Sequence, residues 1–139
     1  MVYVDTSVIV AMLSNEPKAP ACIAWFAEQT QPPYSSDWLI TEFYSAMALK
    51  QRTGQLQNKH IKTLLPLFHT LIESGLQLLP ITRNNFLQAG QLCQQHPNTP
   101  AGDALHLSIA LQSGMQQLVT LDQTQALTAQ QLKLTVDLL

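Results

Sequence analysis

The sequence predicts an α/β fold in which helices cover both faces of a parallel β-sheet. Short apolar runs rich in β-branched residues alternate with longer segments whose apolar residues recur at helical spacing, and this alternation is typical of parallel sheets with helical crossovers. The 139 residues are 46% hydrophobic and only 12% charged, with no internal repeat and no linker-like stretch. We therefore expect one domain over residues 1–139 with a substantial core.

The opening run Met1–Val4 is apolar at consecutive positions, which is typical of a buried parallel strand. It passes through Asp5 into the apolar segment 8–13, so we expect a strand followed directly by a helix. Asp5 would then lie at the carboxyl end of the strand, where open α/β sheets hold their sites. The alternative is that Asp5, Thr6 or Ser7 only caps the helix.

Two proline-containing segments that interrupt regular structure delimit the two short elements expected between residues 16 and 37. In chain order these are a helix at 21–29, between the segments 16–20 and 31–33, and a short parallel strand at 33–36. Ser36 and Asp37 are then typical of a helix start.

The helix expected over 38–52 carries a charge on its apolar face. Four apolar residues recur at helical spacing and share a face with Glu42: Trp38, Leu39, Ala46 and Leu49. A carboxylate among core-facing positions is costly unless it is paired or bound to a cation. Glu42 is therefore a candidate functional residue.

The second half of the chain continues the alternation of helices and strands. The expected elements are a helix over 61–72 that Pro66 kinks or interrupts, a strand at 76–81, a helix at 83–95, a loop at 96–102, a helix at 103–112, a strand at 118–122, a helix at 125–131 and a strand at 132–138. Asp103 begins a helix after a glycine-containing loop. Asp122 ends an apolar strand, as Asp5 does.

Four acids are expected to meet at one edge of the sheet: Asp5, Glu42, Asp103 and Asp122. Strand carboxyl ends and the first turns of the following helices share that edge in parallel sheets. Crowded carboxylates raise one another's pKa unless a cation neutralises them, and hard ions such as Mg²⁺ or Mn²⁺ prefer oxygen ligands. The pattern suits metal-assisted phosphodiester hydrolysis. The simpler alternatives are a helix-start role for Asp103 and a turn role for Asp122.

The remaining chemistry-bearing residues give weaker signals. We expect His106 to be a packed helical histidine, and surface or capping positions for Glu16, Glu28, Asp37, Glu73 and Asp137. Cys22 and Cys93 lack zinc-ligand or disulfide spacing. No apolar run reaches the length of a membrane span and no signal-peptide pattern opens the chain. We therefore expect a cytoplasmic protein with no membrane association.

The net charge of −2 argues against a protein that holds nucleic acid by bulk charge. Basic residues nevertheless cluster in one stretch, namely Lys50, Arg52, Lys59, His60 and Lys62. This stretch is a candidate phosphate-facing edge, with Lys50 and Arg52 as candidate substrate-binding residues. A solvated helix surface explains the cluster equally well.

Four segments together resemble a known family. They are VYVDTSVIVAML at the start, WLITEFYSAMAL around Glu42, GDALHLSIAL around Asp103 and LVTLDQ around Asp122. In this order and spacing they resemble a PIN domain, specifically the VapC-type ribonuclease toxins of bacterial toxin–antitoxin pairs. The resemblance implies a three-layer α/β/α fold with five parallel strands in the order 3-2-1-4-5. It also implies Mg²⁺-dependent endoribonuclease activity, a small VapB-like antitoxin whose C-terminal segment enters the active-site groove, and a homodimer.

The resemblance assigns Asp5, Glu42 and Asp103 to an acidic triad and Asp122 to a fourth acid, all as catalytic metal ligands. It assigns Ser7 and Thr120 to supporting hydroxyls. Many relatives have a basic residue in the loop before the third acid, whereas residues 96–102 contain none except His96.

We therefore expect the metal-dependent endoribonuclease toxin of a type II pair, which hydrolyses RNA phosphodiester bonds with metal-activated water. Mg²⁺ is the expected ion and Mn²⁺ the alternative. Two other classes stay open. One is a phosphoryl-transfer protein with Asp5 as nucleophile, although haloacid-dehalogenase-like enzymes want a second Asp two residues later, where this chain has Ser7. The other is a PIN scaffold that binds RNA or protein without catalysis.

Overall fold

The computed structural model describes residues 1–139 and has a five-stranded parallel sheet at its centre. The strands are β1 (Val2–Val4), β2 (Tyr34–Ser36), β3 (Gln77–Leu79), β4 (Gln117–Thr120) and β5 (Thr135–Leu138). Their order across the sheet is β3-β2-β1-β4-β5, and every neighbouring pair is parallel. This confirms the expected order 3-2-1-4-5. It also places β1, which leads into Asp5, in the middle of the sheet.

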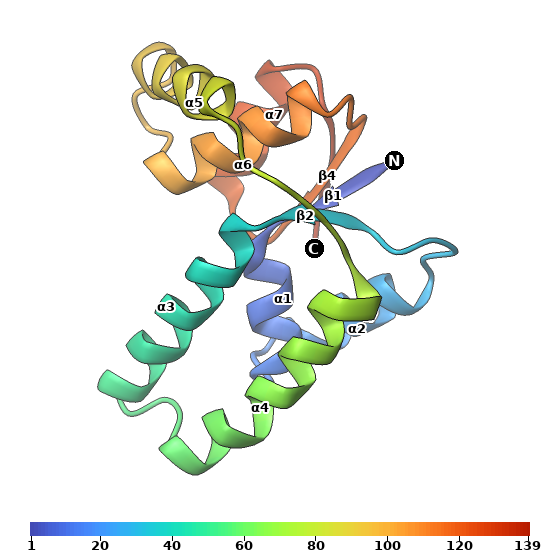
Figure 1. Cartoon of the computed structure of the whole chain (residues 1–139), viewed down its shortest axis with the longest axis vertical. Helices are drawn as coiled ribbons and strands as arrows, with labels where there is room; N and C mark the ends of the chain where they lie inside the picture. The colour runs from blue at the N-terminus through green and yellow to red at the C-terminus, as the bar shows by residue number, and fades with distance from the viewer.

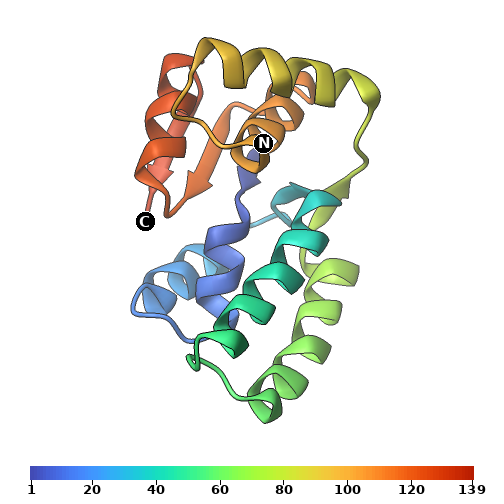
Figure 2. The ribbon, with the colours of Figure 1, turned by 90° about the vertical axis from the view of Figure 1, so that its left-hand side faces the viewer.

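Helices cover both faces of this sheet. They are α1 (Thr6–Leu13), α2 (Ala19–Ala27), α3 (Trp38–Arg52), α4 (Asn58–Thr70), α5 (Arg83–Gln95), α6 (Ala101–Gln112) and α7 (Gln123–Gln131), with a π-helical turn, η1 (Leu71–Gly75), after α4. Figure 1 shows α1–α4 on one side of the sheet and α5–α7 on the other, and Figure 2 shows the same two groups after a quarter turn. The expected three-layer α/β/α architecture is confirmed.

Alternate residues of the central strands supply two separate cores, because successive side chains of a strand point to opposite faces of a sheet. Val4 and Val119 pack with α1–α4 in one core. Their neighbours Tyr3 and Leu118 pack with α5–α7 in the other. The strands are therefore buried on both faces, as their unbroken apolar runs predict.

The expected interruption at Pro66 is wrong, since α4 runs through this residue to Thr70. Pro66 removes the helical donor to the carbonyl of Lys62. Both residues are exposed, so that carbonyl can be hydrated. The irregularity comes later, in the π-helical turn Leu71–Gly75.

Several predicted boundaries differ from the structure by one to three residues. Helix α6 begins at Ala101, two residues earlier than expected, so Gly102 lies in its first turn rather than in a loop. Strand β4 ends at Thr120, and Asp122 is the N-cap of α7 rather than the last strand residue. Strand β5 begins at Thr135 and not at 132. None of the helices has the length and hydropathy needed to cross a membrane.

Candidate active site

A cavity of about 690 Å³ opens at the carboxyl edge of the sheet, and the four predicted acids all line it: Asp5, Glu42, Asp103 and Asp122. They come from the end of β1, the second turn of α3, the first turn of α6 and the cap of α7. The topology explains this meeting for Asp5, Glu42 and Asp122, because in a parallel sheet every strand ends, and the next helix begins, at the same edge. Asp103 reaches the cavity differently, since α6 follows α5 and leads into β4. Residues far apart in the sequence thus share one hollow.

Asp5 is held firmly by neighbouring hydroxyls and is only 4% exposed. Its Oδ2 accepts hydrogen bonds from the Ser7 backbone N at 3.1 Å and from Ser7 Oγ at 2.6 Å, and Thr120 Oγ1 lies 3.2 Å from the same atom. Its Oδ1 accepts a 3.3 Å bond from Gln125 Nε2 and lies 3.6 Å from His106 Nε2. Asp5 therefore caps α1, and it also lines the cavity.

Asp122 is also a cap that keeps one oxygen available. Its Oδ1 accepts a hydrogen bond from the Gln125 backbone N at 2.9 Å, which satisfies the start of α7. Its own backbone N donates to Thr120 Oγ1 at 3.0 Å. Thr120 thus connects the segments that carry the first and last acids.

Glu42 lies on the cavity side of α3 and not on its core side, so the expectation of a core-facing glutamate is wrong in detail. The core side is formed by Leu39, Phe43 and Met47, and Phe43 stacks on Phe68 of α4 with ring centroids 3.8 Å apart. The remaining residues that we placed on the core face line the cavity with Glu42, namely Trp38, Ala46 and Leu49. Glu42 is half-buried, and its Oε1 accepts from Thr6 Oγ1 at 2.7 Å and contacts His106 Nε2.

Asp103 shows the electrostatic cost of gathering these carboxylates. Burial, together with the negative charges of Asp5 and Asp122, raises the pKa of its carboxyl from 3.8 to about 7. His106 opposes the rise and Glu42 contributes a smaller part of it. Near neutral pH this cavity therefore holds a proton on Asp103 or needs a cation in its place.

The chemistry of the donors fits a hydrated hard cation. No three His, Cys, Asp or Glu side chains lie close enough together to coordinate one metal ion directly. A structural zinc ion would need four such ligands. Mg²⁺ keeps several water ligands and takes only one or two protein carboxylates directly. A wide cavity rich in carboxylate oxygens matches that requirement, and one or two of its acids could bind such an ion directly while the others contact its water ligands.

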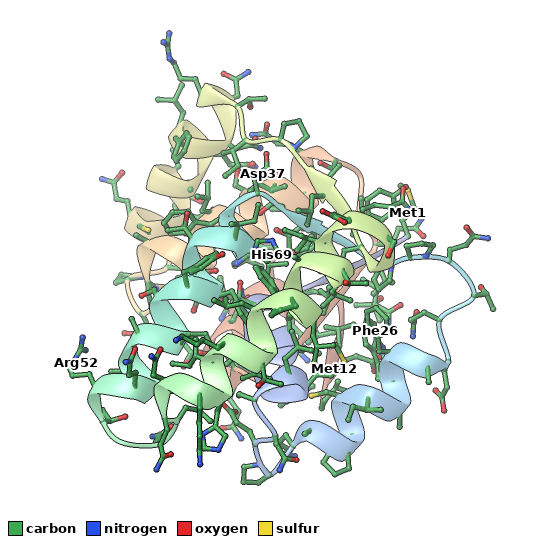
Figure 3. All side chains as sticks on the ribbon, turned by 60° about the horizontal axis from the view of Figure 1, so that its bottom comes forward. Met1, Met12, Phe26, Asp37, Arg52 and His69 are labelled. Atoms are coloured by element: carbon green, nitrogen blue, oxygen red, sulfur yellow. The ribbon has the colours of Figure 1, made fainter.

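Neither of the two basic residues predicted to bind substrate forms an ion pair with one of the four predicted acids. Lys50 forms an ion pair with Glu16, with Nζ and Oε1 2.5 Å apart. Arg52 is exposed in the last turn of α3, and Figure 3 shows its side chain projecting outward, at the opposite end of this helix from Asp37. Glu16, which we expected at a surface or capping position, has a partly exposed side chain and lines the cavity. The cavity therefore has a fifth acid, already paired with a lysine.

Sequence reasoning missed three residues that contact the acids. Thr6 donates to Glu42, Gln125 donates to Asp5, and the histidine expected to be merely packed, His106, contacts Glu42. Gln125 follows Asp122 by three residues, the spacing at which a capping box places Gln or Glu, so a signal for it existed. Nothing in the local sequence indicates which partners Thr6 and His106 would find.

His106 is fully buried and surrounded by oxygen atoms. Burial lowers its pKa, but Tyr3 acts in the opposite direction, as do the carboxylates of Glu42 and Asp5. The net result is a pKa well above the ordinary value of 6.5. A positive imidazolium next to the acids offsets part of their mutual repulsion.

Comparison with known proteins adds a family and several similar folds. The family model described as PIN domain matches residues 2–130, and no curated protein matches the sequence significantly. The fold is similar to that of Mycobacterium tuberculosis VapC20, described as a Sarcin-Ricin loop cleaving toxin, with a TM-score of 0.69 and 15% identity over 85% of this chain and 87% of that one.

Two further solved structures are similar over nearly their whole length. FitAcB from Neisseria gonorrhoeae has a TM-score of 0.67 and 20% identity, over 98% of this chain and 96% of that one. VapBC2 from Rickettsia felis, bound to a DNA fragment from their promoter, has a TM-score of 0.62 and 16% identity, over 100% of this chain and 99% of that one. At these identities the likeness shows the fold alone.

Proposed function

The chain belongs to the PIN domain family, and from this premise we propose that it is a metal-dependent endoribonuclease that acts as the toxin of a type II toxin–antitoxin pair. Its substrate would be cytoplasmic RNA, and the reaction would be hydrolysis of a phosphodiester bond. Mg²⁺ is the proposed cofactor, with Mn²⁺ as the alternative.

The observation that carries the proposal is the cavity with four carboxylates from four separate segments of the chain. Natural proteins seldom bury like charges together without a partner of opposite sign. Here the cost is visible in Asp103, whose pKa is raised to about 7. An acidic cavity repels a phosphodiester, so the arrangement suits phosphate chemistry only when cations occupy it. That requirement is characteristic of a metal-dependent nuclease.

We assign Asp5 and Asp103 to the principal ion, and Glu42 and Asp122 to completing the acidic pocket. A bound Mg²⁺ would activate water and stabilise the leaving oxygen. The chain's own contribution is to orient the ligands. Ser7 and Thr120 serve as the supporting hydroxyls, because both contact Asp5 Oδ2 and leave Oδ1 facing away from them.

Substrate and partners are also part of the proposal. VapC20 is described as a Sarcin-Ricin loop cleaving toxin, and VapBC2 as bound to a DNA fragment from their promoter. We take the shared fold as support for an RNA substrate and a small VapB-like antitoxin of this chain. We further propose a homodimer. Lys50 and Arg52 remain our proposed substrate contacts. Lys50 is the stronger candidate because its partner Glu16 lines the cavity.

The Asp5→Asn variant tests the proposed activity. We expect cleavage of an RNA substrate in Mg²⁺ to fall by more than about 100-fold. The variant lacks a proposed ligand of the metal ion, and the ion supplies several kcal/mol of transition-state charge stabilisation. Wild-type cleavage should stop when EDTA removes the metal and return when Mg²⁺ is added.

The matched control is Glu28→Gln, which removes an exposed carboxylate just after α2, outside the cavity. It should cleave RNA at the wild-type rate. Equal cleavage by wild type and by a folded Asp5→Asn protein would refute the proposed function, as would cleavage that survives EDTA.

A further inference from the structure

Glu42 differs from the other three acids in how it is held. Asp5 and Asp122 cap helices, and Asp103 lies in the first turn of α6. All three sit at helix N-termini, where backbone N–H groups favour negative charge. Glu42 lies one turn further into α3 and has no such support. The groups that fix its carboxylate must come from other elements.

Two buried side chains that contact each other connect Glu42 to the far side of the sheet. Tyr3 of β1 and His106 of α6 are both 0% exposed, and Tyr3 Oη lies 2.7 Å from His106 Nδ1. The two rings meet edge to face, with centroids 5.6 Å apart. The other ring nitrogen, Nε2, contacts Glu42 Oε1. A tyrosine from the middle of the sheet is thus connected to a carboxylate of the cavity through one imidazole.

Thr6 closes this arrangement on the cavity side. Its Oγ1 donates to Glu42 Oε1 at 2.7 Å and lies 3.0 Å from His106 Nε2. Glu42 Oε1 is therefore committed to protein partners. The second oxygen, Oε2, lies next to Gly102, where an added Cβ would stand only 2.9 Å from it. One carboxylate oxygen is anchored and the other is directed toward the turn that carries Asp103.

We propose that Tyr3 and His106 are positioning residues that fix the Glu42 carboxylate so that its Oε2 can serve the metal site; this inference rests on the proposed function. The Tyr3 hydroxyl can donate to Nδ1 or accept from it, so it orients the ring in either protonation state, while Nε2–H points at Glu42 in both. Partners that orient a metal ligand in this way influence metal affinity strongly although they never touch the ion.

The test needs variants that remove the contact without emptying the core. Tyr3→Phe removes one hydroxyl and keeps the ring. His106→Leu removes both ring nitrogens, and His106→Gln keeps an amide donor where Nε2 stood. The control is Tyr44→Phe, because Tyr44 forms a similar hydrogen bond at 3.1 Å, to His69 on the surface.

The first measurement reports on Glu42 directly and needs no metal. The chain has only four glutamates, namely Glu16, Glu28, Glu42 and Glu73, so the side-chain carboxyl ¹³C signals are few, and Glu42→Gln identifies the one from Glu42. Tyr3→Phe and His106→Leu should both shift that signal, whereas Tyr44→Phe should leave it unchanged. An unshifted signal in folded Tyr3→Phe and His106→Leu protein would overturn the inference.

The second measurement is Mn²⁺ affinity by calorimetry on the full chain. We expect His106→Leu to weaken binding by about 10- to 100-fold, Tyr3→Phe to weaken it less, His106→Gln to recover part of the loss, and Tyr44→Phe to have no effect. Unchanged affinity in Tyr3→Phe and both His106 variants would overturn the inference even if the carboxyl signal moves. If His106→Leu does not fold, Tyr3→Phe and His106→Gln decide.

The two proposals fail in different ways. If wild-type protein binds no Mn²⁺ and cleaves no RNA, the proposed function fails, and with it the metal part of this inference. The other outcome is that wild type binds Mn²⁺ and cleaves RNA while Tyr3→Phe and His106→Leu have the wild-type Glu42 carboxyl signal and the wild-type Mn²⁺ affinity. In that case only the positioning role fails.

Discussion

The two edges of the same sheet carry cavities of opposite character. At the carboxyl edge, five acids line a cavity of about 690 Å³. At the amino edge, where β1–β4 begin, a cavity of about 380 Å³ is lined mainly by glutamine, threonine and proline residues and by no Asp, Glu, His, Lys or Arg side chain. The strands that form both edges are the same, so the difference comes from the segments that connect the strands at each edge.

Helix starts explain why the charge gathers at one edge. Helices that follow parallel strands begin at the carboxyl edge, and their N-termini offer free N–H groups and a partial positive charge. Asp5 and Asp122 occupy such positions, and Asp103 lies in the first turn of α6, which follows α5. Glu42 occupies no such position, and it is the acid that relies on a histidine and a threonine from other elements. The comparison teaches that helix N-termini help to stabilise three of the acids, whereas Glu42 depends on side chains alone.

The largest expected effect comes from removing one charge at the carboxyl edge. Asp103→Asn should lower Mg²⁺-dependent RNA cleavage by more than about 100-fold, through loss of a proposed ligand. It should also raise the melting temperature of the metal-free protein at pH 8, because the lost carboxylate repels its neighbours. Asp137→Asn, an exposed acid on β5, is the control for cleavage assays and thermal melts. Cleavage by Asp103→Asn within a few-fold of wild type would contradict the assignment.

Loss of a supporting hydroxyl should have the next largest effect. Ser7→Ala removes the 2.6 Å bond to Asp5 Oδ2 and a 3.0 Å bond from the Leu121 backbone N. We expect Mn²⁺ affinity, measured by calorimetry, to fall by about 10- to 100-fold because a ligand loses its orienting partner. Ser74→Ala, at an exposed serine that bonds only its own helical turn, should bind Mn²⁺ normally. Wild-type affinity in Ser7→Ala would show that this hydroxyl is dispensable.

The pH dependence of stability should reveal the crowded charge. The pKa of Asp103 is about 7 in the folded protein and 3.8 as its ordinary value, so between these values the folded state binds a proton that the unfolded state has released. The free energy of unfolding of the metal-free protein should therefore fall as the pH rises from about 4 to about 7. The slope of this fall corresponds to at most one bound proton per molecule.

Chemical denaturation at several pH values measures this slope. Asp103→Asn should remove the fall, and saturating Mg²⁺ should reduce it, because a bound cation favours the ionised carboxyl. An identical pH profile for wild type and Asp103→Asn would mean that the acids do not repel one another as the structure indicates.

The smallest expected effect concerns the basic end of α3. Lys50→Met should weaken RNA binding only a few-fold, because Lys50 is already paired with Glu16 and partly exposed ion pairs contribute little. The slope of the logarithm of the RNA-binding constant against the logarithm of the salt concentration reports the number of counterions released. In Lys50→Met this number should fall by less than one. Lys133→Met, at an exposed lysine between α7 and β5, is the control for the same fluorescence titrations. No change in the salt dependence would remove Lys50 from the substrate contacts.

Much of this molecule follows from local sequence. Unbroken apolar runs predict strands buried on both faces, helical spacing predicts the segments between them, and the parallel arrangement then sends Asp5 and Asp122 to one edge. Helix α3 over Trp38–Arg52 and helix α5 over Arg83–Gln95 match the predicted bounds. Strand and helix formation depends mainly on neighbouring residues, so one sequence contains enough information to predict these elements.

Tertiary structure alone decided how each site residue is partnered. The apolar stripe of α3 is wide, and the sequence cannot distinguish its core side, with Leu39 and Phe43, from its cavity side, with Trp38 and Glu42. The contacts that hold the acids join residues such as Tyr3 with His106, and Asp5 with Gln125, that lie 103 and 120 positions apart. Local periodicity carries no information about such pairs, since only the packing of helices on both faces of the sheet brings them together.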